Sequence, residues 1–443
     1  MKNQLISTAR APELVKKLWI TAGFLAVYRM GVFVPTPGVN SDELSKFIAQ
    51  GASLFGVFNA FSGGALARFS VFALGIMPYI SSSIIFSLLT VVSPKLAQLQ
   101  KEGGELGRKK INQYTRYGTI LIAVIQSYGI ASWLQSNPGG MHIVDHPGFA
   151  FKFMSVITLT AGTCFIMWLG EQISQRGIGN GTSLIIFASI LSRFPSAVRF
   201  LWEKVTAGEM GGGDFFLFAV LAFVVVGVIV FFERAQRRIP VHHAKKVVGR
   251  KMYGASMQFL PLKINMSGVI PPIFASSILL FPGTMAQFLH TRFPQLSDVA
   301  LWFQPGSWLY DVLYVVGIVF FCYFYTAIQF NPDDVADNVK KSGGFVPGIR
   351  PGKNTAEYID RVLTRLTTCG AVYVAAICIL PFFFFSNYQV FLGGTSLLIV
   401  VGVMMNFIEQ VQSYLMAQRY DSFLGDSSSS RSRSSRFKVR RGA

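Results

Sequence analysis

The chain has 443 residues, of which 51% are hydrophobic and only 14% are charged, and its formal net charge is +19 at pH 7. Soluble domains carry about 25% charged residues, so this composition excludes a single soluble domain and indicates a helical protein that crosses a membrane several times. The first apolar run, 18–34, contains Arg29 and lacks a small-residue cleavage site behind it, so we interpret it as a retained span.

Stretches of about 20 mostly apolar residues recur along the whole chain and predict membrane spans. Ten such stretches occur, at 18–34, 71–92, 117–136, 151–169, 183–203, 215–233, 266–289, 308–330, 366–386 and 395–413. The stretch 183–203 has the weakest signal, because Arg193 and Arg199 interrupt it. The predicted fold is therefore an all-α polytopic membrane protein with ten transmembrane helices.

The basic residues orient these spans. If the N-terminus is cytoplasmic, 32 of the 40 Lys and Arg lie on the cytoplasmic side, at Arg176 and in the segments 1–17, 93–116, 234–265, 331–365 and 414–443. Because cytoplasmic loops carry an excess of basic residues, we predict that both termini are cytoplasmic. The Ser/Arg-rich tail 414–443 has the composition of a disordered segment and suggests no role.

Two short repeats divide the chain into halves. "GIMPYISSSI" (75–84) aligns with "GVIPPIFASS" (268–277), and "GTSLII" (181–186) aligns with "GTSLLI" (394–399). The repeats open spans two and seven, and spans five and ten, so the repeating unit has five spans and its second copy must enter the membrane in the opposite direction. We expect a first half (18–203), a periplasmic linker (204–214) and a second half (215–413).

Isoleucines occupy the positions that the repeats pair. In inverted repeats the functional path lies between the halves, where equivalent positions face each other. We therefore expect four isoleucines to converge at the membrane midplane: Ile80, Ile273, Ile186 and Ile399. Ile76 joins them, because it lies one helical turn before Ile80 on the same face. Stiff, β-branched side chains would form a narrow, dry constriction. The alternative is that these isoleucines only pack helices together.

A short apolar segment precedes the second span. "FNAFSGGALARFSVF" (58–72) is too short to cross a bilayer, and six of its fifteen residues are Phe, Leu or Val, yet it contains Arg68 and the Ser62-Gly63-Gly64 break. Composition alone also fits an amphipathic helix on the membrane surface.

The sequence contains no recognisable catalytic or metal-binding motif. It has no HExxH, GxSxG or P-loop pattern, and "GIGNG" (177–181) follows a span rather than a strand, which argues against dinucleotide binding. His242-His243 has no thiol or carboxylate at ligand spacing. The cysteines fall inside spans and are interpreted as small buried apolar side chains: Cys164, Cys322, Cys369 and Cys378. We therefore predict that the protein is not an enzyme and needs no cofactor.

Several long stretches carry a family resemblance. They are "YRMGVFVPTPG" (28–38), "FNAFSGGALARFSVFALGIMPYISSSI" (58–84), "INQYTRYGT" (111–119), "WLGEQISQRGIGNG" (168–181), "LPLKINMSGVIPPIFASS" (260–277), "FNPDDVADNVKKSGGFVPGIRPG" (330–352) and "GGTSLLIVVG" (393–402). Together they resemble the SecY family, the channel subunits of the general protein-secretion translocon, along nearly the full length of the chain, and the bacterial form most of all.

The resemblance implies a role for the segment 58–72. In the family this stretch is a short re-entrant helix, the plug, that closes the resting pore, and we call residues 58–72 the plug segment. The matching residues here are Phe58, Phe61, Gly63, Gly64 and Arg68. The glycine pair would let the plug hinge away.

The resemblance also assigns the pore and its side gate. The family's pore ring maps onto Ile76, Ile80, Ile186, Ile273 and Ile399, and its sixth position, usually apolar, is Thr182 here. The Thr182 hydroxyl could bond back to its own helix and leave the methyl group in the pore. A threonine at this position would still make that wall of the pore seal less apolar than in the family. Spans two (73–92) and seven would form a lateral gate toward lipid, with a polar latch from Ser81, Ser82, Gln126 and Asn265.

Two basic loops complete the implied function. The loop 234–265 carries Arg250-Lys251, and the loop 331–365 presents Arg350 between Pro-Gly steps within "VPGIRPG". The family uses these loops to bind the ribosome and the SecA ATPase, and it includes the small membrane subunits SecE and SecG. The implied function is translocation of unfolded secretory polypeptides, which carry signal peptides, across the bacterial inner membrane. The channel would also insert membrane proteins sideways into membrane lipid.

The alternative is an inverted-repeat secondary transporter, but the substrate site of such a transporter normally holds charged residues at the membrane midplane. The acidic residues near the spans lie at or near span ends: Glu171, Glu233, Asp311 and Glu409.

Overall fold

The computed structural model describes residues 12–45, 59, 62–101, 104–135, 143–208, 211–243, 246–248, 251–253, 257–289, 302–303, 307–385 and 394–438. Each of the ten predicted spans corresponds to a helix. These helices are α2 (Pro12–Gly31), α5 (Met77–Val92), α7 (Gly104–Gln135), α8 (Phe149–Arg176), α9 (Gly181–Thr206), α10 (Gly212–Arg234), α11 (Ile270–Leu289), α13 (Trp308–Gln329), α15 (Lys353–Phe385) and α16 (Gly394–Lys438).

Most of these helices are long and apolar enough to cross a bilayer. Among the described residues, seven qualify by length and composition alone, and Met77–Val92 and Ile270–Leu280 are shorter apolar helices. The helix α2 contains Lys16, Lys17 and Arg29, which lowers its apolar character. The chain is therefore a multi-pass membrane protein, as the sequence predicts.

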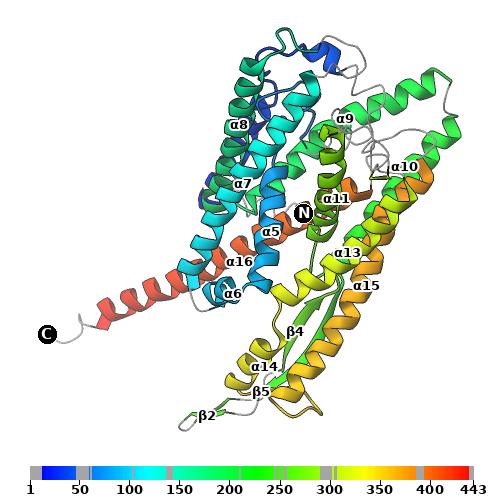
Figure 1. The fold of residues 1–443 in the computed structure, drawn as a ribbon. Helices are drawn as coiled ribbons and strands as arrows, with labels where there is room; N and C mark the ends of the chain where they lie inside the picture. The colour runs from blue at the N-terminus through cyan, green and yellow to red at the C-terminus, as the bar shows by residue number, and fades with distance from the viewer. Residues whose placement is uncertain are drawn as a thin grey trace.

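The helices form two groups that meet along a shared boundary (Figure 1). In the first group α7 packs against α5 and α8, and α8 against α2 and α9; in the second α13 packs against α11 and α15, and α16 against α10 and α15. Across the boundary α5 and α7 contact α11, and α16 contacts α9 and α2. The groups are the two five-helix halves that the repeats predict.

The repeated residues adopt matching backbone conformations. Gly75 and Gly268 both have positive φ, +57° and +63°, and in each half a helix begins two residues later, at Met77 and at Ile270. A left-handed residue cannot lie inside a helix and favours glycine. Span two therefore starts at Met77 rather than at 71, because residues 71–76 form turns; hydropathy could not reveal this boundary.

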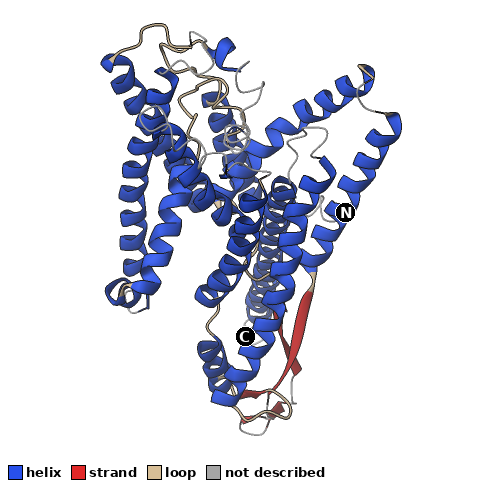
Figure 2. Ribbon diagram, turned by 45° about the vertical axis from the view of Figure 1, so that its right-hand side comes forward, coloured by secondary structure: helices blue, strands red, loops and turns tan. Residues whose placement is uncertain are grey.

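The two basic loops 234–265 and 331–365 contain strands that hydropathy did not predict. Strands β1 (Gln236–His243), β4 (Met257–Lys263) and β5 (Gly344–Phe345) form an antiparallel sheet in the order β4-β1-β5. The sheet lies beside helices at one end of the molecule (Figure 2), next to the short helix α14 (Pro332–Lys341) and the first turns of α15. A second hairpin pairs β2 (Lys246–Val248) with β3 (Lys251–Tyr253). The sheet packs on a separate small core of Ile239, Leu262 and Val346.

Two expectations differ from the structure. The tail 414–443 was predicted to be disordered, but α16 is described as helix as far as Lys438; the stretch after 413 begins with good helix formers such as Leu415 and Met416, so the helix continues. Cys369 is exposed on α15 rather than buried, whereas Cys322 and Cys378 are buried as predicted.

Candidate functional site

The five ring isoleucines are all buried. Their exposed fractions range from 0% for Ile399 to 7% for Ile273, and they come from both halves: Ile76 caps α5, Ile80 lies on α5, Ile186 on α9, Ile273 on α11 and Ile399 on α16. All belong to one continuous apolar core that joins the halves. This placement is compatible with a ring, but whether the five enclose a pore remains a prediction.

Thr182 is held at the start of α9. Its hydroxyl donates to Asn180 Oδ1 at 2.7 Å, and its backbone N–H donates to the same oxygen at 3.1 Å. Its methyl carbon lies beside α8, 3.4 Å from where a Cβ on Gly170 would stand. The hydroxyl is therefore satisfied by the residue that caps its own helix, and the methyl packs against α8.

From residue 62 onward the plug segment consists of consecutive turns, whereas Asn59, described before them, is helical. Residues 62–69 are turns, residue 70 forms a bridge, and turns resume through residue 76. Left-handed conformations interrupt the path at Gly63, Gly64 and Phe69, whose φ values are +67°, +89° and +42°. Such residues break helical hydrogen bonding. Phe58 and Phe61 lie outside the described residues.

The plug segment is buried although it is irregular. Leu66 and Phe69 are at most 4% exposed, and a short antiparallel bridge joins Ser70 to Pro35. Thr36 donates its N–H to the Phe69 carbonyl at 2.8 Å, and Val71 donates to the Val34 carbonyl at 3.0 Å. Arg68 is exposed, with its guanidinium 4.4 Å from the centre of the Phe33 ring.

The four predicted latch residues are not joined by hydrogen bonds among the described residues. Ser82 Oγ donates to the Thr115 carbonyl of α7 at 2.7 Å, while Gln126 is buried and its Oε1 has no partner. Ser81 is half-buried. Asn265 bonds elsewhere, so the structure gives no support to a latch that unites all four.

Asn265 instead bonds a buried carboxylate that the sequence analysis did not single out as functional. Its Nδ2 donates to Glu233 Oε1 at 2.7 Å and to the Gly268 carbonyl at 3.1 Å, and Ser267 Oγ donates to Asn265 Oδ1 at 3.2 Å. Glu233 is 6% exposed and Asn265 4%. This network ties the end of α10 to the turn before α11. In the sequence, the one feature that pointed to this network was the acidic residue Glu233 at the end of the very apolar span 215–233.

The turn around Arg350 has a fixed backbone. Gly348 and Gly352 have φ values of +81° and +104°, and Thr355 Oγ1 donates to the Arg350 carbonyl at 3.0 Å. The Arg350 side chain is exposed. Arg250 lies outside the described residues, and Lys251 begins β3, but its side chain is not described.

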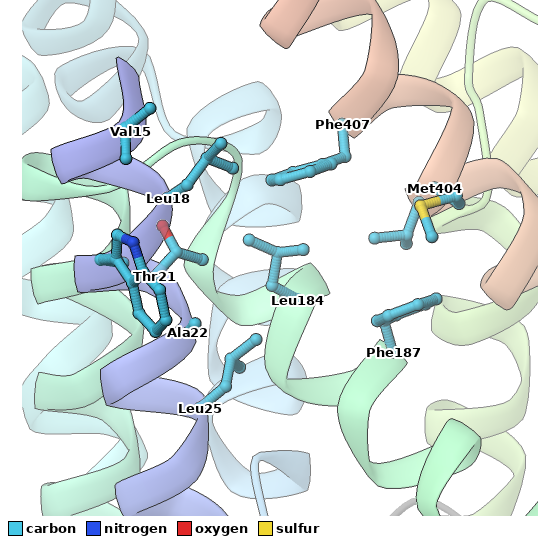
Figure 3. A pocket seen from close by; sticks show the side chains of 11 residues that line it. Val15, Leu18, Thr21, Ala22, Leu25, Leu184, Phe187, Met404 and Phe407 are labelled. Atoms are coloured by element: carbon cyan, nitrogen blue, oxygen red, sulfur yellow. The ribbon is translucent and has the colours of Figure 1, made fainter. Parts of the chain in front are cut away.

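An apolar groove lies between α2, α9 and α16 (Figure 3). Its volume is about 400 Å³, and its walls combine helices of both halves. The lining residues are Val15, Leu18, Trp19, Thr21, Ala22, Leu25, Leu184, Phe187, Val403, Met404 and Phe407. One rim is braced by Lys17, whose Nζ lies 3.3 Å from the Tyr414 hydroxyl and 4.4 Å from the centre of its ring.

Ten helices in two five-helix halves, with buried isoleucines at the repeated positions, define a polytopic membrane protein built from two repeated halves. The SecY family model matches residues 70–408. The chain is 53% identical over 417 residues to protein translocase subunit SecY of Escherichia coli strain K12, covering 93% of this chain and 94% of that protein. It is 52% identical over 420 residues to the Vibrio cholerae subunit, with the same coverage. The chain belongs to the SecY family.

Solved structures agree on the fold at much lower sequence identity. A protein-conducting channel matches with a TM-score of 0.64 at 17% identity, covering 90% of this chain and 92% of that one. Sec61 of the canine ribosome–channel complex from the endoplasmic reticulum matches with a TM-score of 0.62, also at 17% identity and with the same coverage. None of these relatives favours the alternative of a secondary transporter, and the family consists of channel subunits rather than enzymes.

The Asn265–Glu233 bond provides a stability prediction. Asn265→Asp would place two carboxyl groups where an amide now donates to a carboxylate, so we expect the free energy of unfolding to fall by about 2–3 kcal/mol. Thermal unfolding of the detergent-purified protein would measure this as a lower Tm.

Glu409→Gln is the matched control, because Glu409 pairs with Lys263 at 2.6 Å but both side chains are well exposed. Loss of an exposed pair costs about 1 kcal/mol or less. Equal changes in Tm from the two substitutions would show that the Glu233–Asn265 network does not stabilise the second half.

Proposed function

We propose that this chain is the pore-forming subunit of a protein-conducting channel in the cytoplasmic membrane of a bacterium, with both termini in the cytoplasm. It moves unfolded secretory polypeptides across the membrane and releases apolar segments sideways into lipid. The observation that carries this proposal is the apolar boundary between the halves, where α5 contacts α11 and the repeated isoleucines are buried.

An isoleucine ring suits a passage for chains of any sequence. Isoleucine side chains offer no hydrogen bonds, so the ring has no preference for particular polar groups, and a dry constriction opposes ions and water. Because the contact is non-directional, it can close again after the polypeptide has left. Separation of α5 from α11 would open the path to lipid.

Partners must supply the energy for transport. We propose that the exposed Arg350 turn and the basic loop with Arg250 and Lys251 bind the SecA motor ATPase and, during cotranslational insertion, the ribosome. A guanidinium on a fixed turn can form paired hydrogen bonds with phosphates or carboxylates. Structures of related channels bound to ribosomes, in dog and in yeast, support this assignment.

The small subunits SecE and SecG are proposed to pack on the lipid-facing surface. For one of their helices we favour the apolar groove between α2, α9 and α16 (Figure 3). A helix in this groove would contact both halves at once and would hold them together while α5 and α11 separate on another side.

The plug role predicts that deletion of residues 60–70 leaves a folded protein with a leaky resting pore. The deletion removes Ser70 and therefore its bridge to Pro35, but the ten helices would keep their contacts. Single-channel recording in planar bilayers, without a translocating substrate, should show a higher ion conductance. An unchanged conductance would remove the plug role from this segment.

The ring role predicts that replacement of Ile80, Ile273 or Ile399 by Ser or Gly lets water enter the constriction and raises the ion conductance of the resting channel. Ile278 of α11 is the matched control, since it is 41% exposed and lies on the same helix as Ile273. Ile278→Ser should leave the conductance unchanged. If both kinds of substitution had the same effect on leak, the buried isoleucines would be packing residues only.

The docking role predicts that Arg350→Glu weakens partner binding but changes the free energy of unfolding by only about 0.5 kcal/mol or less. The reversed charge repels phosphate or carboxylate, and Arg350→Lys should restore only part of the function because an ammonium cannot form the paired bonds. The measurements are secretion by membrane vesicles supplied with the motor ATPase, and ribosome affinity at several salt concentrations. Loss of one phosphate contact should reduce the salt slope by about 1.

Normal secretion and an unchanged salt slope in the Arg350→Glu variant would contradict this role. The basic residue would then serve only to orient the chain in the membrane.

A further inference from the structure

The Ser62–Gly63 turn of the plug segment lies unusually close to the backbone of α9. A Cβ built on Gly63 would stand 3.0 Å from Ser189 Cα and 3.2 Å from the Ser189 carbonyl oxygen. Gly63 also has a φ of +67°. Both the space and the backbone conformation therefore favour glycine here.

Two neighbouring residues of α2 hold this turn from the other side. Arg29 Nη1 donates to the Gly63 carbonyl at 3.0 Å. The Tyr28 hydroxyl lies 2.6 Å from Ser189 Oγ and 3.5 Å from the Ser62 carbonyl. Tyr28 is 1% exposed, so its contacts form in a dry environment, where a hydrogen bond is strong and an unpaired polar group is costly, whereas the Arg29 bond is partly buried.

The Tyr28 hydroxyl has one proton, which it can donate to Ser189 Oγ or to the Ser62 carbonyl. When it donates to Ser62, its oxygen accepts from Ser189 Oγ; when it donates to Ser189, the Ser189 proton goes to the Ile185 carbonyl at 2.8 Å. The phenol thereby joins α2 to α9 directly beneath the turn. Its ring stacks on Phe72, which follows the plug segment's bridge residue Ser70, with centroids 5.9 Å apart.

We infer that Arg29 and Tyr28 are positioning residues for the plug: they fix the Ser62–Gly63 turn against α9 and set how readily the channel opens. The inference rests on the proposed role of residues 58–72 as a plug. The backbone bridge at residues 34–36 and 69–71 involves neither side chain, so it can remain as a hinge when the turn leaves α9.

Arg68 provides a matched control for Arg29. Both guanidinium groups lie over the Phe33 ring, at 4.9 Å for Arg29 and 4.4 Å for Arg68. Of these two guanidinium groups, Arg29 donates a hydrogen bond to the Ser62–Gly63 turn, and the described structure shows no such bond from Arg68. Removal of either charge changes the electrostatics around Phe33, but only one of the two removals breaks the bond to the turn.

The test measures how often the turn leaves α9. Ser62→Cys, a nearly isosteric change at a site that is 2% exposed, serves as the probe in the full-length protein, and a membrane-impermeant maleimide labels it when it reaches water. Mass spectrometry of the peptides separates this signal from native Cys378, which is buried in the second half and reports on general unfolding.

Arg29→Gln should raise the labelling rate of the probe about tenfold, as expected for loss of a charge-assisted hydrogen bond. Tyr28→Phe, which keeps the ring stacked on Phe72, should raise it about threefold. Arg29→Lys should fall between wild type and Arg29→Gln, and Arg68→Gln should stay within about twofold of wild type. Cys378 labelling should not change.

Three results would overturn the inference: equal probe labelling in wild type and Arg29→Gln, equal increases in Arg29→Gln and Arg68→Gln, or a parallel increase at Cys378, which would make both residues general supports of the fold. Failure of the plug role is separable, because it is measured by the conductance of the 60–70 deletion. If that deletion leaks and Arg29→Gln does not alter labelling, only the positioning role is wrong. If labelling responds but the deletion does not leak, the contact stands and the plug role is lost.

Discussion

The protein depends on an apolar contact between two halves that must exclude ions when closed and yet separate when a polypeptide arrives. Burial of one isoleucine side chain contributes about 1.5–3 kcal/mol relative to water, so a few such residues seal a path firmly. Because the contact is not directional, it can re-form around side chains of any shape. A seal made of hydrogen bonds would select for particular partners and would leave costly unpaired groups when broken.

Side-chain hydrogen bonds, which are directional, are found instead where irregular backbone meets the end of a helix. Arg29 holds the Gly63 carbonyl, and Asn265 holds Glu233 just before α11 begins. Each bond joins an irregular stretch of backbone to the end of a helix. Irregular backbone inside a membrane protein is tolerated only where protein or water satisfies its polar groups, so these side chains also make the turns possible.

Much of this architecture could be predicted from the sequence. The ten spans follow from apolar run length, and the positions of Ile80, Ile273, Ile186 and Ile399 follow from two repeats alone, without any knowledge of the fold. The match between Gly75 and Gly268 at positive φ shows that even a ten-residue repeat reported a real backbone feature. These signals can be read from the order of residues alone, because they depend on run length and on matching short stretches and not on which segments touch in space.

What the sequence could not reveal depends on contacts between distant segments. Ser189 looks like one more small residue in a span, yet its hydroxyl lies 2.6 Å from that of Tyr28, 161 positions away. Residues 71–76 look like the start of span two, yet a left-handed glycine delays the helix. Hydropathy measures how apolar a residue is. It carries no information on the backbone angle φ or on which side-chain hydroxyl groups form hydrogen bonds with each other.

The separation between apolar seal and polar anchors has a consequence for how substitutions act. In the proposed channel the isoleucines determine how tightly the closed state excludes ions, whereas the inferred role of the Arg29 and Tyr28 bonds is to determine how much of the time the plug turn is in place. A weakened anchor shifts the population without altering the seal itself, whereas a smaller ring residue weakens the seal and, because it buries less apolar surface, also makes the closed state less stable. The two kinds of substitution should therefore combine additively in their free energies, because no anchor hydrogen bond involves the side chain of a ring isoleucine in the described structure.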